Sequence, residues 1–210
     1  MIFKICGLRE KDSLICCAAN NVDFFGLIFY EKSPRNINLD EAKKLIKFSK
    51  NLTIKPVGVF VNHKISDLKY IITFLNLKYI QLHGDENQLY INEIKNEFKL
   101  KIIKKISIKN ESDLDKINEF ENIDYLLFDY KPKSNELPGG NSKSFDWNLL
   151  KEVTIKLPWF VSGGINESNI KNIKKTINPH GIDLSSGVEE SLGIKSNEKI
   201  NNLFRLFYDN

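Results

Sequence analysis

Short apolar runs alternate with amphipathic stretches along the whole chain, in about eight repeats with a period of roughly 25 residues. The apolar runs predict strands, because nearly continuous apolar character is typical of parallel strands that are covered on both faces. The predicted strands are 2–6, 24–29, 56–61, 79–82, 101–106, 124–129, 159–162 and 182–184. The predicted helices are 11–20, 39–50, 65–75, 86–98, 111–120, 147–153, 166–175 and 198–207. The chain is therefore a strand–helix unit repeated from end to end.

Strand–helix units that close on themselves in this number form a (β/α)8 barrel, or TIM barrel, of the α/β class. The chain has 210 residues, near the short end of the range for this fold, which begins at about 200 residues. No linker rich in Gly, Ser or Pro divides it, so residues 1–210 are predicted to be a single barrel domain. A doubly wound open sheet is the alternative, although that fold has no need of equal repeated units.

The composition excludes several classes of protein. Charged residues make up 28% of the chain and the two signs nearly balance, at a net charge of +4, which argues against disorder. The pI of 8.8 is mildly basic, but no block of Lys and Arg indicates a nucleic-acid partner. No apolar run reaches the roughly 18–20 residues of a membrane span, and the N-terminus shows no signal-peptide pattern. The three cysteines form no CxxC pair, so we expect a reduced, cytoplasmic protein.

The predicted barrel indicates where the chemistry lies, because active sites of this fold are built at the C-terminal ends of the strands. Polar side chains follow several predicted strands at that end, and the opposite end offers no comparable set. These polar residues are Cys6, Arg35, Asn62, His83, Asp85, Asp129, Ser162 and Asp183.

Two of these residues stand out by their chemistry. A cysteine on an apolar strand is most often a small core residue, and Cys16 and Cys17 in the first predicted helix fit that role. Cys6 differs because it ends the first strand at the catalytic rim. Asp129 closes an apolar run, where a carboxylate costs desolvation free energy unless it is paired or used. A loop or capping role is the alternative for Asp129.

Two turns with glycine follow the last two predicted strands, at Gly163-Gly164 and at Ser185-Ser186-Gly187. Glycines allow backbone N–H groups to approach a phosphate closely. The loops after strands seven and eight are the usual phosphate site of this fold. The turns therefore predict phosphate binding, and the alternative is a pair of tight turns that need positive φ.

Several short motifs occur in order at these barrel positions. They are Lys4-Ile5-Cys6-Gly7-Leu8, Gly26-Leu27-Ile28-Phe29-Tyr30, Lys32-Ser33-Pro34-Arg35, Val57-Gly58-Val59-Phe60-Val61, Gln81-Leu82-His83-Gly84-Asp85-Glu86, Phe128-Asp129, Gly139-Gly140, Phe145-Asp146-Trp147, Gly163-Gly164 and Gly181-Ile182-Asp183-Leu184-Ser185-Ser186-Gly187-Val188-Glu189. With these motifs, nearly the whole chain resembles the phosphoribosylanthranilate isomerase family, the third-step enzymes of the tryptophan branch.

The resemblance implies an Amadori rearrangement of N-(5-phosphoribosyl)anthranilate to a 1-deoxyribulose 5-phosphate derivative. A general acid protonates the ring oxygen, which gives a Schiff base, and a general base then removes the C2′ proton. By position, the family's acid matches Asp129 and its base matches Cys6. A free thiol has a pKa of about 8.5, so Cys6 needs a lowered pKa or a partner. Asp129 needs a pKa raised above about 3.9 to carry a proton near neutrality.

The resemblance also implies how the substrate is bound. Arg35 matches the position that faces the anthranilate carboxylate, and its planar guanidinium suits bidentate binding. Asp183 matches a position near the substrate's amine or hydroxyls, and Gln81 and His83 are expected to give supporting polar contacts. Phosphate is expected at the turns of strands seven and eight, with a contribution from Gly140.

The expected partner is therefore a small phosphorylated molecule, with no nucleic acid or membrane, and the enzyme is expected to be a monomer or homodimer. The reaction is redox-neutral, so no metal or organic cofactor is expected, and His63, His83 and His180 form no metal-like cluster in sequence. The alternatives are a sister phosphate barrel, such as an indole-glycerol-phosphate synthase or a histidine-pathway isomerase, and a nucleic-acid-binding or scaffold protein. Cys6 at strand one argues against both sister enzymes.

One loop departs from the family pattern. The family commonly has Gly-Gly-Thr-Gly-Lys after strand six, whereas this chain has Gly139-Gly140-Asn141-Ser142-Lys143. Glycine adopts positive φ freely and serine does so at a cost. We expect the loop to take a different path, because Asn141 tolerates the left-handed region better than most residues.

Overall fold

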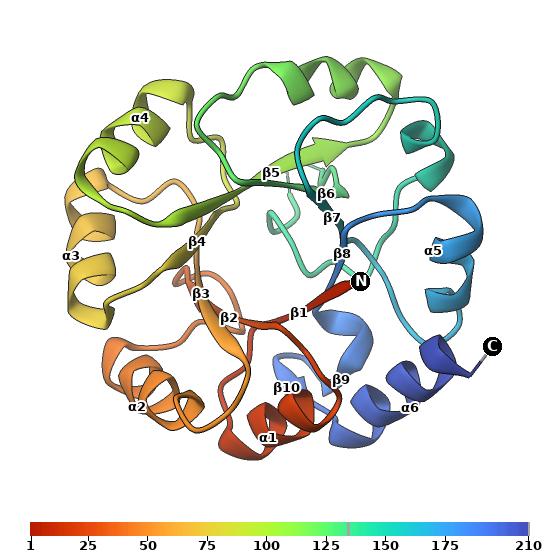
Figure 1. Ribbon diagram of the computed structural model, residues 1–210, viewed down its shortest axis with the longest axis horizontal. Coiled ribbons are helices and arrows are strands. Elements are labelled where there is room, and N and C mark those ends of the chain that lie inside the picture. The colour runs from red at the N-terminus through yellow and green to blue at the C-terminus, as the bar shows by residue number, and fades with distance from the viewer. Residues whose placement is uncertain (134, 210) are drawn as a thin grey trace.

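The computed structural model describes residues 1–133 and 135–209, and its centre is a closed barrel of parallel strands (Figure 1). The strands are β1 (Ile2–Cys6), β2 (Phe24–Phe29), β3 (Lys55–Phe60), β4 (Tyr79–Leu82), β5 (Lys101–Ile108), β6 (Tyr125–Tyr130), β7 (Trp159–Val161) and β8 (Gly181–Leu184). The barrel closes where β8 pairs with β1, with Lys4 opposite Asp183. The predicted (β/α)8 barrel is confirmed, and the open doubly wound sheet is wrong.

Helical segments surround the barrel (Figure 1). The α-helices are α1 (Lys11–Ala19), α2 (Leu39–Ser49), α3 (Ile65–Leu75), α4 (Gln88–Glu97), α5 (Ile170–Thr176) and α6 (Asn197–Tyr208). The 3-10 helices are η1 (Glu111–Asn118), η2 (Trp147–Leu150) and η3 (Ser186–Val188). Asn38 caps α2 as expected, because its side chain accepts the N–H of Glu41 at 2.9 Å.

The predicted α-helices after β5 and β6 are wrong in type, because both segments are 3-10 helices. Each turns apolar side chains three residues apart toward the core: Leu114 with Ile117, and Trp147 with Leu150. Side chains at that spacing eclipse one another in a 3-10 helix, so this tighter winding presents both on one side.

The helix predicted over residues 166–175 begins later, at Ile170. Side-chain hydrogen bonds replace its first turn: Asn169 Oδ1 accepts the N–H of Asn166 at 2.9 Å, and Asn166 Oδ1 accepts the N–H of Ser168 at 2.9 Å. Asparagine side chains compete with helical hydrogen bonds in this way. The pattern of apolar positions carries no information about this competition, so it did not predict the later start of the helix.

An antiparallel hairpin of β9 (Glu189–Ser191) and β10 (Ile194–Lys195) follows β8 and was not predicted from the sequence. Its turn contains Gly193 at a φ of +83°, and a Cβ atom there would lie 2.7 Å from the carbonyl oxygen of Pro34. The hairpin is therefore packed against the loop after β2, which contains Arg35.

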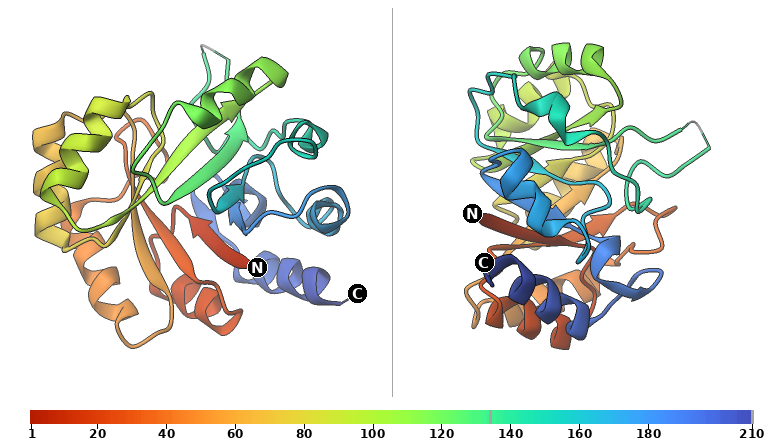
Figure 2. Two further views of the ribbon diagram at one scale, coloured as in Figure 1. Left: turned by 45° about the horizontal axis from the view of Figure 1, so that its top comes forward. Right: turned by 90° about the vertical axis from the view of Figure 1, so that its right-hand side faces the viewer.

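The barrel interior changes character along the strands. Nearer the N-terminal ends of the strands, the interior is an apolar layer of Phe24, Val57, Ile103, Leu127 and Phe160. Toward the C-terminal ends, inward positions become polar, as β1 shows with Ile2, Lys4 and Cys6 at alternate positions. Figure 2 shows the loop after β6 projecting from the end of the barrel opposite the N-terminus of β1. Charged and polar groups therefore meet at one end, under that loop.

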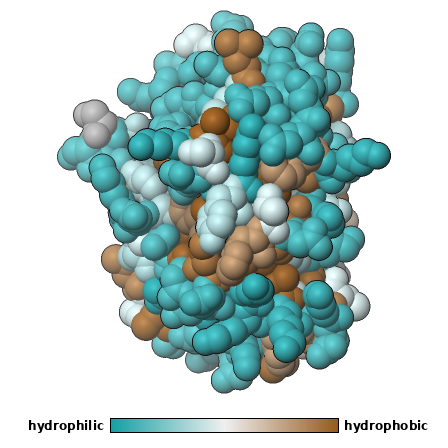
Figure 3. Space-filling model, turned by 90° about the vertical axis from the view of Figure 1, so that its left-hand side faces the viewer, coloured by the Kyte–Doolittle hydropathy of each residue, from teal (hydrophilic) through white to brown (hydrophobic). Residues whose placement is uncertain are grey.

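The outer face around α3 is mostly hydrophilic, with a band of apolar side chains across its middle (Figure 3). On this helix Tyr70 is 59% exposed and stacks on Phe74, whose ring also lies 4.2 Å from the ammonium group of Lys43. Within residues 1–133 and 135–209, no helix combines the length and the apolar character needed to cross a membrane.

The apolar layer gives a test of what stabilises the barrel. Phe160 is 1% exposed and packs edge-on against Phe24 and Tyr125. Phe160→Ala should lower the free energy of unfolding by about 3–5 kcal/mol, because the barrel strands cannot collapse into the cavity. Urea titration followed by circular dichroism measures the loss. Leu89→Ala, at a side chain 78% exposed, is the matched control and should change the free energy of unfolding by less than about 0.5 kcal/mol. Equal effects of the two variants would contradict this account.

Candidate active site

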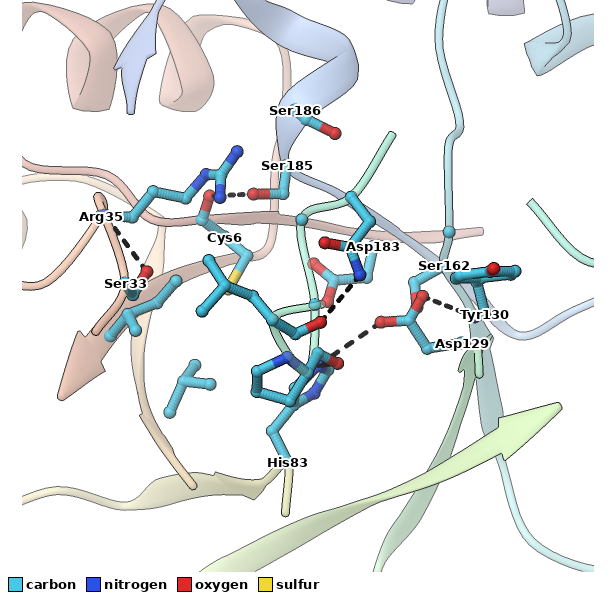
Figure 4. Close-up of a pocket in the computed structure, with 18 of the residues that line it drawn as sticks. Cys6, Ser33, Arg35, His83, Asp129, Tyr130, Ser162, Asp183, Ser185 and Ser186 are labelled. Carbon is cyan, nitrogen blue, oxygen red and sulfur yellow. Dashed lines mark hydrogen bonds and ion pairs between the residues drawn. The ribbon is translucent and has the colours of Figure 1, made fainter. Parts of the chain in front are cut away.

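A pocket opens at the C-terminal ends of the strands, and every site residue predicted from the sequence lines it (Figure 4). These residues are Cys6, Arg35, Gln81, His83, Asp129, Gly140, Gly163, Gly164, Asp183, Ser185, Ser186 and Gly187. Ser162 also lines the pocket, whereas Asn62 and Asp85 lie outside it. The Asn62 side chain instead accepts the backbone N–H of Asp85 at 2.7 Å, so it orders the rim.

Asp129 lies one residue before the end of β6 and lines the pocket, and it is 7% exposed. Burial raises its pKa to about 6, and the Lys105 ammonium group and the N–H of Tyr130 oppose that rise. The N–H of Tyr130 donates to Oδ1 at 2.8 Å, and Oδ2 lies 3.5 Å from Nε2 of His83. Asp129 can therefore hold a proton near neutral pH and remain fixed in orientation.

Cys6 ends β1 and is also 7% exposed. Its sulfur and the Asp129 carboxyl group face the same space from different sides (Figure 4). Gly26 on β2 makes room for the thiol, because a Cβ there would lie 2.7 Å from Sγ. Burial raises the pKa of Cys6, while the ammonium groups of Lys4 and Lys195 oppose the rise. Cys6 thus has the charged partner that was expected from the sequence, but its pKa is raised, so the thiol is protonated in the resting protein.

Lys4 and Asp183 form a buried ion pair beneath Cys6. The Lys4 Nζ atom lies 2.9 Å from both carboxylate oxygens of Asp183, and Lys4 is 1% exposed. Burial alone would lower the pKa of Lys4, but the neighbouring Asp183 carboxylate and Cys6 sulfur raise it above its ordinary value. Sequence reasoning missed Lys4, although a lysine two residues before Cys6 on an inward face was a usable signal.

His83 is held as a neutral ring by its neighbours. Its Nδ1 atom lies 2.9 Å from Nε2 of Gln81, and its Nε2 atom lies 3.1 Å from the carbonyl oxygen of Pro138. A carbonyl only accepts, so we assign the ring hydrogen to Nε2. Burial and the ammonium groups of Lys105 and Lys4 lower the pKa of His83 well below its ordinary value.

Gln81 has hydrogen-bonding capacity to spare. Its side chain is buried, and its Oε1 atom accepts no hydrogen bond from any residue that the structure describes. An unpartnered buried oxygen on a pocket wall is suited to a hydroxyl of a bound molecule.

Arg35 reaches the pocket from the loop after β2 and is 3% exposed. Its Nε and Nη2 atoms lie 2.7 and 2.8 Å from the two carboxylate oxygens of Glu189. Gly140 lies against the other side of the guanidinium, where a Cβ would be 2.3 Å from Nη1. Gly140, which we assigned to phosphate from the sequence, therefore adjoins Arg35. Glu189 was missed because it lies 154 residues from Arg35 along the chain.

The two glycine turns are packed against each other and against the loop after β6. A Cβ at Gly187 would lie 1.9 Å from the carbonyl oxygen of Ile165, and one at Gly164 would lie 2.8 Å from the carbonyl carbon of Lys143. Gly163 and Gly164 have φ values of +89° and +62°. Close packing and positive φ thus both require glycine here. In residues 1–133 and 135–209, the N–H groups of Gly164 and Ser186 meet no protein acceptor, so they can donate to an anion.

The loop expectation for Ser142 is wrong. Ser142 has a φ of +55°, in the left-handed region that we expected it to avoid. Asn141 does not take that conformation, and its side-chain Nδ2 instead donates to the carbonyl oxygen of Leu137 at 2.8 Å. This hydrogen bond ties Asn141 back to the segment before Gly139-Gly140, and the left-handed residue is the one that follows it.

Outside the two positions left undescribed, no group of three or more His, Cys, Asp or Glu residues is arranged to hold a metal ion.

The family of the chain follows from comparison with known proteins. A model of the N-(5'-phosphoribosyl)anthranilate (PRA) isomerase family matches residues 3–205. The N-(5'-phosphoribosyl)anthranilate isomerase of Paramagnetospirillum magneticum is 37% identical over 94% of this chain and 92% of its own length. Solved structures agree. Monomers of the dimeric phosphoribosylanthranilate isomerase of Thermotoga maritima match at a TM-score of 0.84 and 26% identity, over all of both chains. A phosphoribosyl anthranilate isomerase in complex with reduced 1-(o-carboxyphenylamino)-1-deoxyribulose 5-phosphate matches at 0.83 and 27%, also over all of both chains. With a family match over almost its full length and with this barrel and pocket, the chain belongs to the N-(5'-phosphoribosyl)anthranilate isomerase family.

Proposed function

We propose that the protein is the N-(5'-phosphoribosyl)anthranilate isomerase of tryptophan biosynthesis. It converts its substrate to 1-(2-carboxyphenylamino)-1-deoxyribulose 5-phosphate by an Amadori rearrangement. The observation that carries this function is that Asp129 and Cys6 face one pocket, which Arg35 and the two glycine turns also line. A sugar held at both ends would place its ring between an acid and a base.

Asp129 is the general acid of the first step. Its carboxyl group gives a proton to the ring oxygen as the C1′–O bond breaks, and the nitrogen lone pair forms the Schiff base. The raised pKa of about 6 keeps part of the Asp129 population protonated at neutral pH. The carboxylate left behind is stabilised by the N–H of Tyr130 and the nearby Lys105 ammonium group.

Cys6 is the general base of the second step. Its thiolate removes the C2′ proton of the Schiff base, which gives an enolamine that tautomerises to the ketone. Burial makes this thiolate scarce but strongly basic, and the adjacent Lys4 ammonium group stabilises it when it forms. The C2′ proton that Cys6 takes is balanced by a proton gained at C1′ when the enolamine tautomerises. The reaction is therefore redox-neutral, and the chemistry needs no metal or organic cofactor.

The remaining pocket residues bind and orient the substrate. Arg35 binds the anthranilate carboxylate, and the turns at Gly163-Gly164 and Ser185-Ser186-Gly187 bind the phosphate. Gln81, His83 and Asp183 line the floor between them and meet the sugar hydroxyls and the bridging amine. Fixing both ends of the molecule converts the proton transfers into effectively unimolecular steps.

The protein works in the cytoplasm on a small phosphorylated molecule, as a monomer or homodimer. Its three cysteines are all free in the structure, which suits a reducing compartment. The related Thermotoga maritima protein is dimeric, which supports the homodimer as one of the two states.

The function is tested with freshly prepared N-(5'-phosphoribosyl)anthranilate. The fluorescence of the anthranilate group should fall as the purified protein converts the substrate, and the product should be recovered with its phosphate intact. Exhaustive EDTA treatment should leave the rate unchanged. A purified, folded protein with no rate above the uncatalysed reaction would overturn the proposed function.

The acid and base are tested by removing each side chain. Cys6→Ala and Asp129→Asn should each lower kcat by at least about 10²-fold, the lower end expected for the loss of a general acid or base. The KM should change much less, because neither side chain mainly binds the ground state. Cys16→Ala and Asp85→Asn, which remove the same groups outside the pocket, are the matched controls. Near-normal kcat values in folded Cys6 and Asp129 variants would refute these roles.

The pH dependence follows from both pKa values being raised. The active form has Asp129 protonated and Cys6 ionised. Below about pH 6 the kcat/KM should rise tenfold per pH unit, because only the thiolate fraction changes. Above pH 6 the gain in thiolate and the loss of protonated Asp129 cancel, so the profile becomes level until Cys6 itself titrates.

The change of slope near pH 6 in the profile of kcat/KM against pH reports the titration of Asp129. In Asp129→Asn the residual activity should keep rising through pH 6, since the group that cancels the thiolate gain is gone. Persistence of the change of slope in that variant would assign it to another residue.

A further inference from the structure

A buried network of charges joins the β9–β10 hairpin to Arg35. Glu189 binds Arg35 through both oxygens, and Lys195 Nζ lies 2.7 Å from Glu189 Oε1. Arg35, Glu189 and Lys195 are 3%, 7% and 6% exposed. Two further hydrogen bonds hold the carboxylate and its backbone: Gly193 N–H donates to Oε2 at 3.2 Å, and Lys199 Nζ donates to the Glu189 carbonyl at 2.6 Å.

The geometry of this pairing determines what Arg35 can offer to a ligand. A guanidinium carries five N–H donors in a planar fork, with one edge at Nε and Nη2 and another at Nη1 and Nη2. Glu189 occupies the first edge completely. The second edge is turned toward Gly140, where a Cβ would lie 2.3 Å from Nη1 and 3.3 Å from Nη2. The absence of a side chain at Gly140 leaves room beside that edge, within the pocket.

The charges of the network do not cancel. Burial alone would raise the pKa of Glu189, but Arg35 and Lys195 hold it below its ordinary value, so the carboxylate is ionised. Burial lowers the pKa of Lys195, and the Glu189 carboxylate opposes that fall. With Lys195 protonated, two cations surround one anion, and the network has one net positive charge at the pocket wall. A buried unbalanced charge is costly unless a ligand of opposite sign completes it.

Lys195 also contacts the other end of the site. Its Nζ donates to the carbonyl oxygen of Ser185 at 3.1 Å, and the Ser185 hydroxyl donates to the carbonyl oxygen of Cys6 at 3.2 Å. The same lysine thus supports the Glu189 carboxylate and the turn proposed to bind phosphate.

We propose that Glu189 and Lys195 are positioning residues for substrate recognition: Glu189 fixes one edge of Arg35, so that the opposite edge is presented to the substrate carboxylate. Lys195 restores the positive charge that Glu189 would otherwise neutralise. This inference rests on the proposed function, since it takes the ligand to be an anthranilate carboxylate. It assigns the specificity for a carboxylated aromatic amine to the hairpin as well as to Arg35.

The test compares two ligands on several variants. The first ligand is reduced 1-(o-carboxyphenylamino)-1-deoxyribulose 5-phosphate, and the second is the same compound without its carboxyl group. Calorimetry gives both Kd values. The Kd of the second ligand divided by the Kd of the first reports how much the carboxylate contributes to binding. In Glu189→Gln this ratio should fall at least tenfold from the wild-type value, while kcat at saturation falls less than about threefold. Lys195→Met should also lower the ratio, because it removes a positive charge. Glu189→Asp, which keeps the charge but shortens its reach to Arg35, should lower the ratio too, and it carries the test of positioning if Glu189→Gln does not fold.

For Glu189→Gln, a positioning role and a purely electrostatic role predict opposite changes in the Kd ratio. The substitution makes the site more positive, so a purely electrostatic role would raise the ratio, whereas loss of positioning lowers it. Glu86→Gln is the matched control, because Glu86 also forms a buried ion pair, with Lys104 at 2.9 Å, outside the pocket. It should leave the ratio unchanged.

The outcomes separate this inference from the function on which it rests. A ratio that is unchanged or raised in folded Glu189→Gln would overturn the positioning role and leave the isomerase function standing. A wild-type protein that binds the two ligands equally, or neither of them, would overturn the carboxylate-binding function and this inference together.

Discussion

The enclosure of charged groups at one end of a closed barrel is the constraint on which the rest of this structure depends. Each strand turns every second side chain inward, and at the C-terminal end several of these side chains are ionisable. An isolated buried charge is unstable, so each must find a partner. Lys4 finds Asp183 across the β1–β8 seam that closes the barrel, and Arg35 finds Glu189 from the hairpin after β8. The Lys4–Asp183 ion pair therefore belongs both to the pocket and to the pair of strands that closes the barrel.

The same enclosure explains the protonation of the proposed acid and base. Desolvation disfavours the charged form of any group, so it raises the pKa values of both Asp129 and Cys6. In the proposed mechanism this shift helps the acid directly. For the proposed base it makes the thiolate rare, and the Lys4 ammonium group beside it opposes the rise. Burial thus has the same effect on both groups, and a neighbouring charge opposes it at Cys6.

The parts of the structure that could be predicted from sequence are those with a local or repeating signal. Strand and helix periods predicted the barrel, its strand order and the end at which the pocket lies. The resemblance to a family predicted roles for Cys6 and Asp129, which the structure places in one pocket. Contacts between distant segments carried no such signal. The Arg35–Glu189 pair joins two loops far apart in the chain. Lys4 had a local signal in its position two residues before Cys6, but its pairing with Asp183, 179 residues away, had none. The positive φ of Ser142 was mispredicted because the side-chain hydrogen bond of Asn141 to Leu137 has no signal in the sequence pattern.

The glycine turns show why structural and functional explanations of one residue need not compete. Gly164 is required by its positive φ and by the approach of the loop at Lys143, and Gly187 is required by the carbonyl of Ile165. Those close approaches bring the turns after β7 and β8 together with the loop after β6. With no side chains between them, the turns leave backbone N–H groups directed at the pocket. The loop that packs on Gly164 also carries Gly140 to the guanidinium of Arg35. The proposed phosphate site and the proposed carboxylate site are consequently both in contact with the loop after β6, so a shift of that loop would change both together.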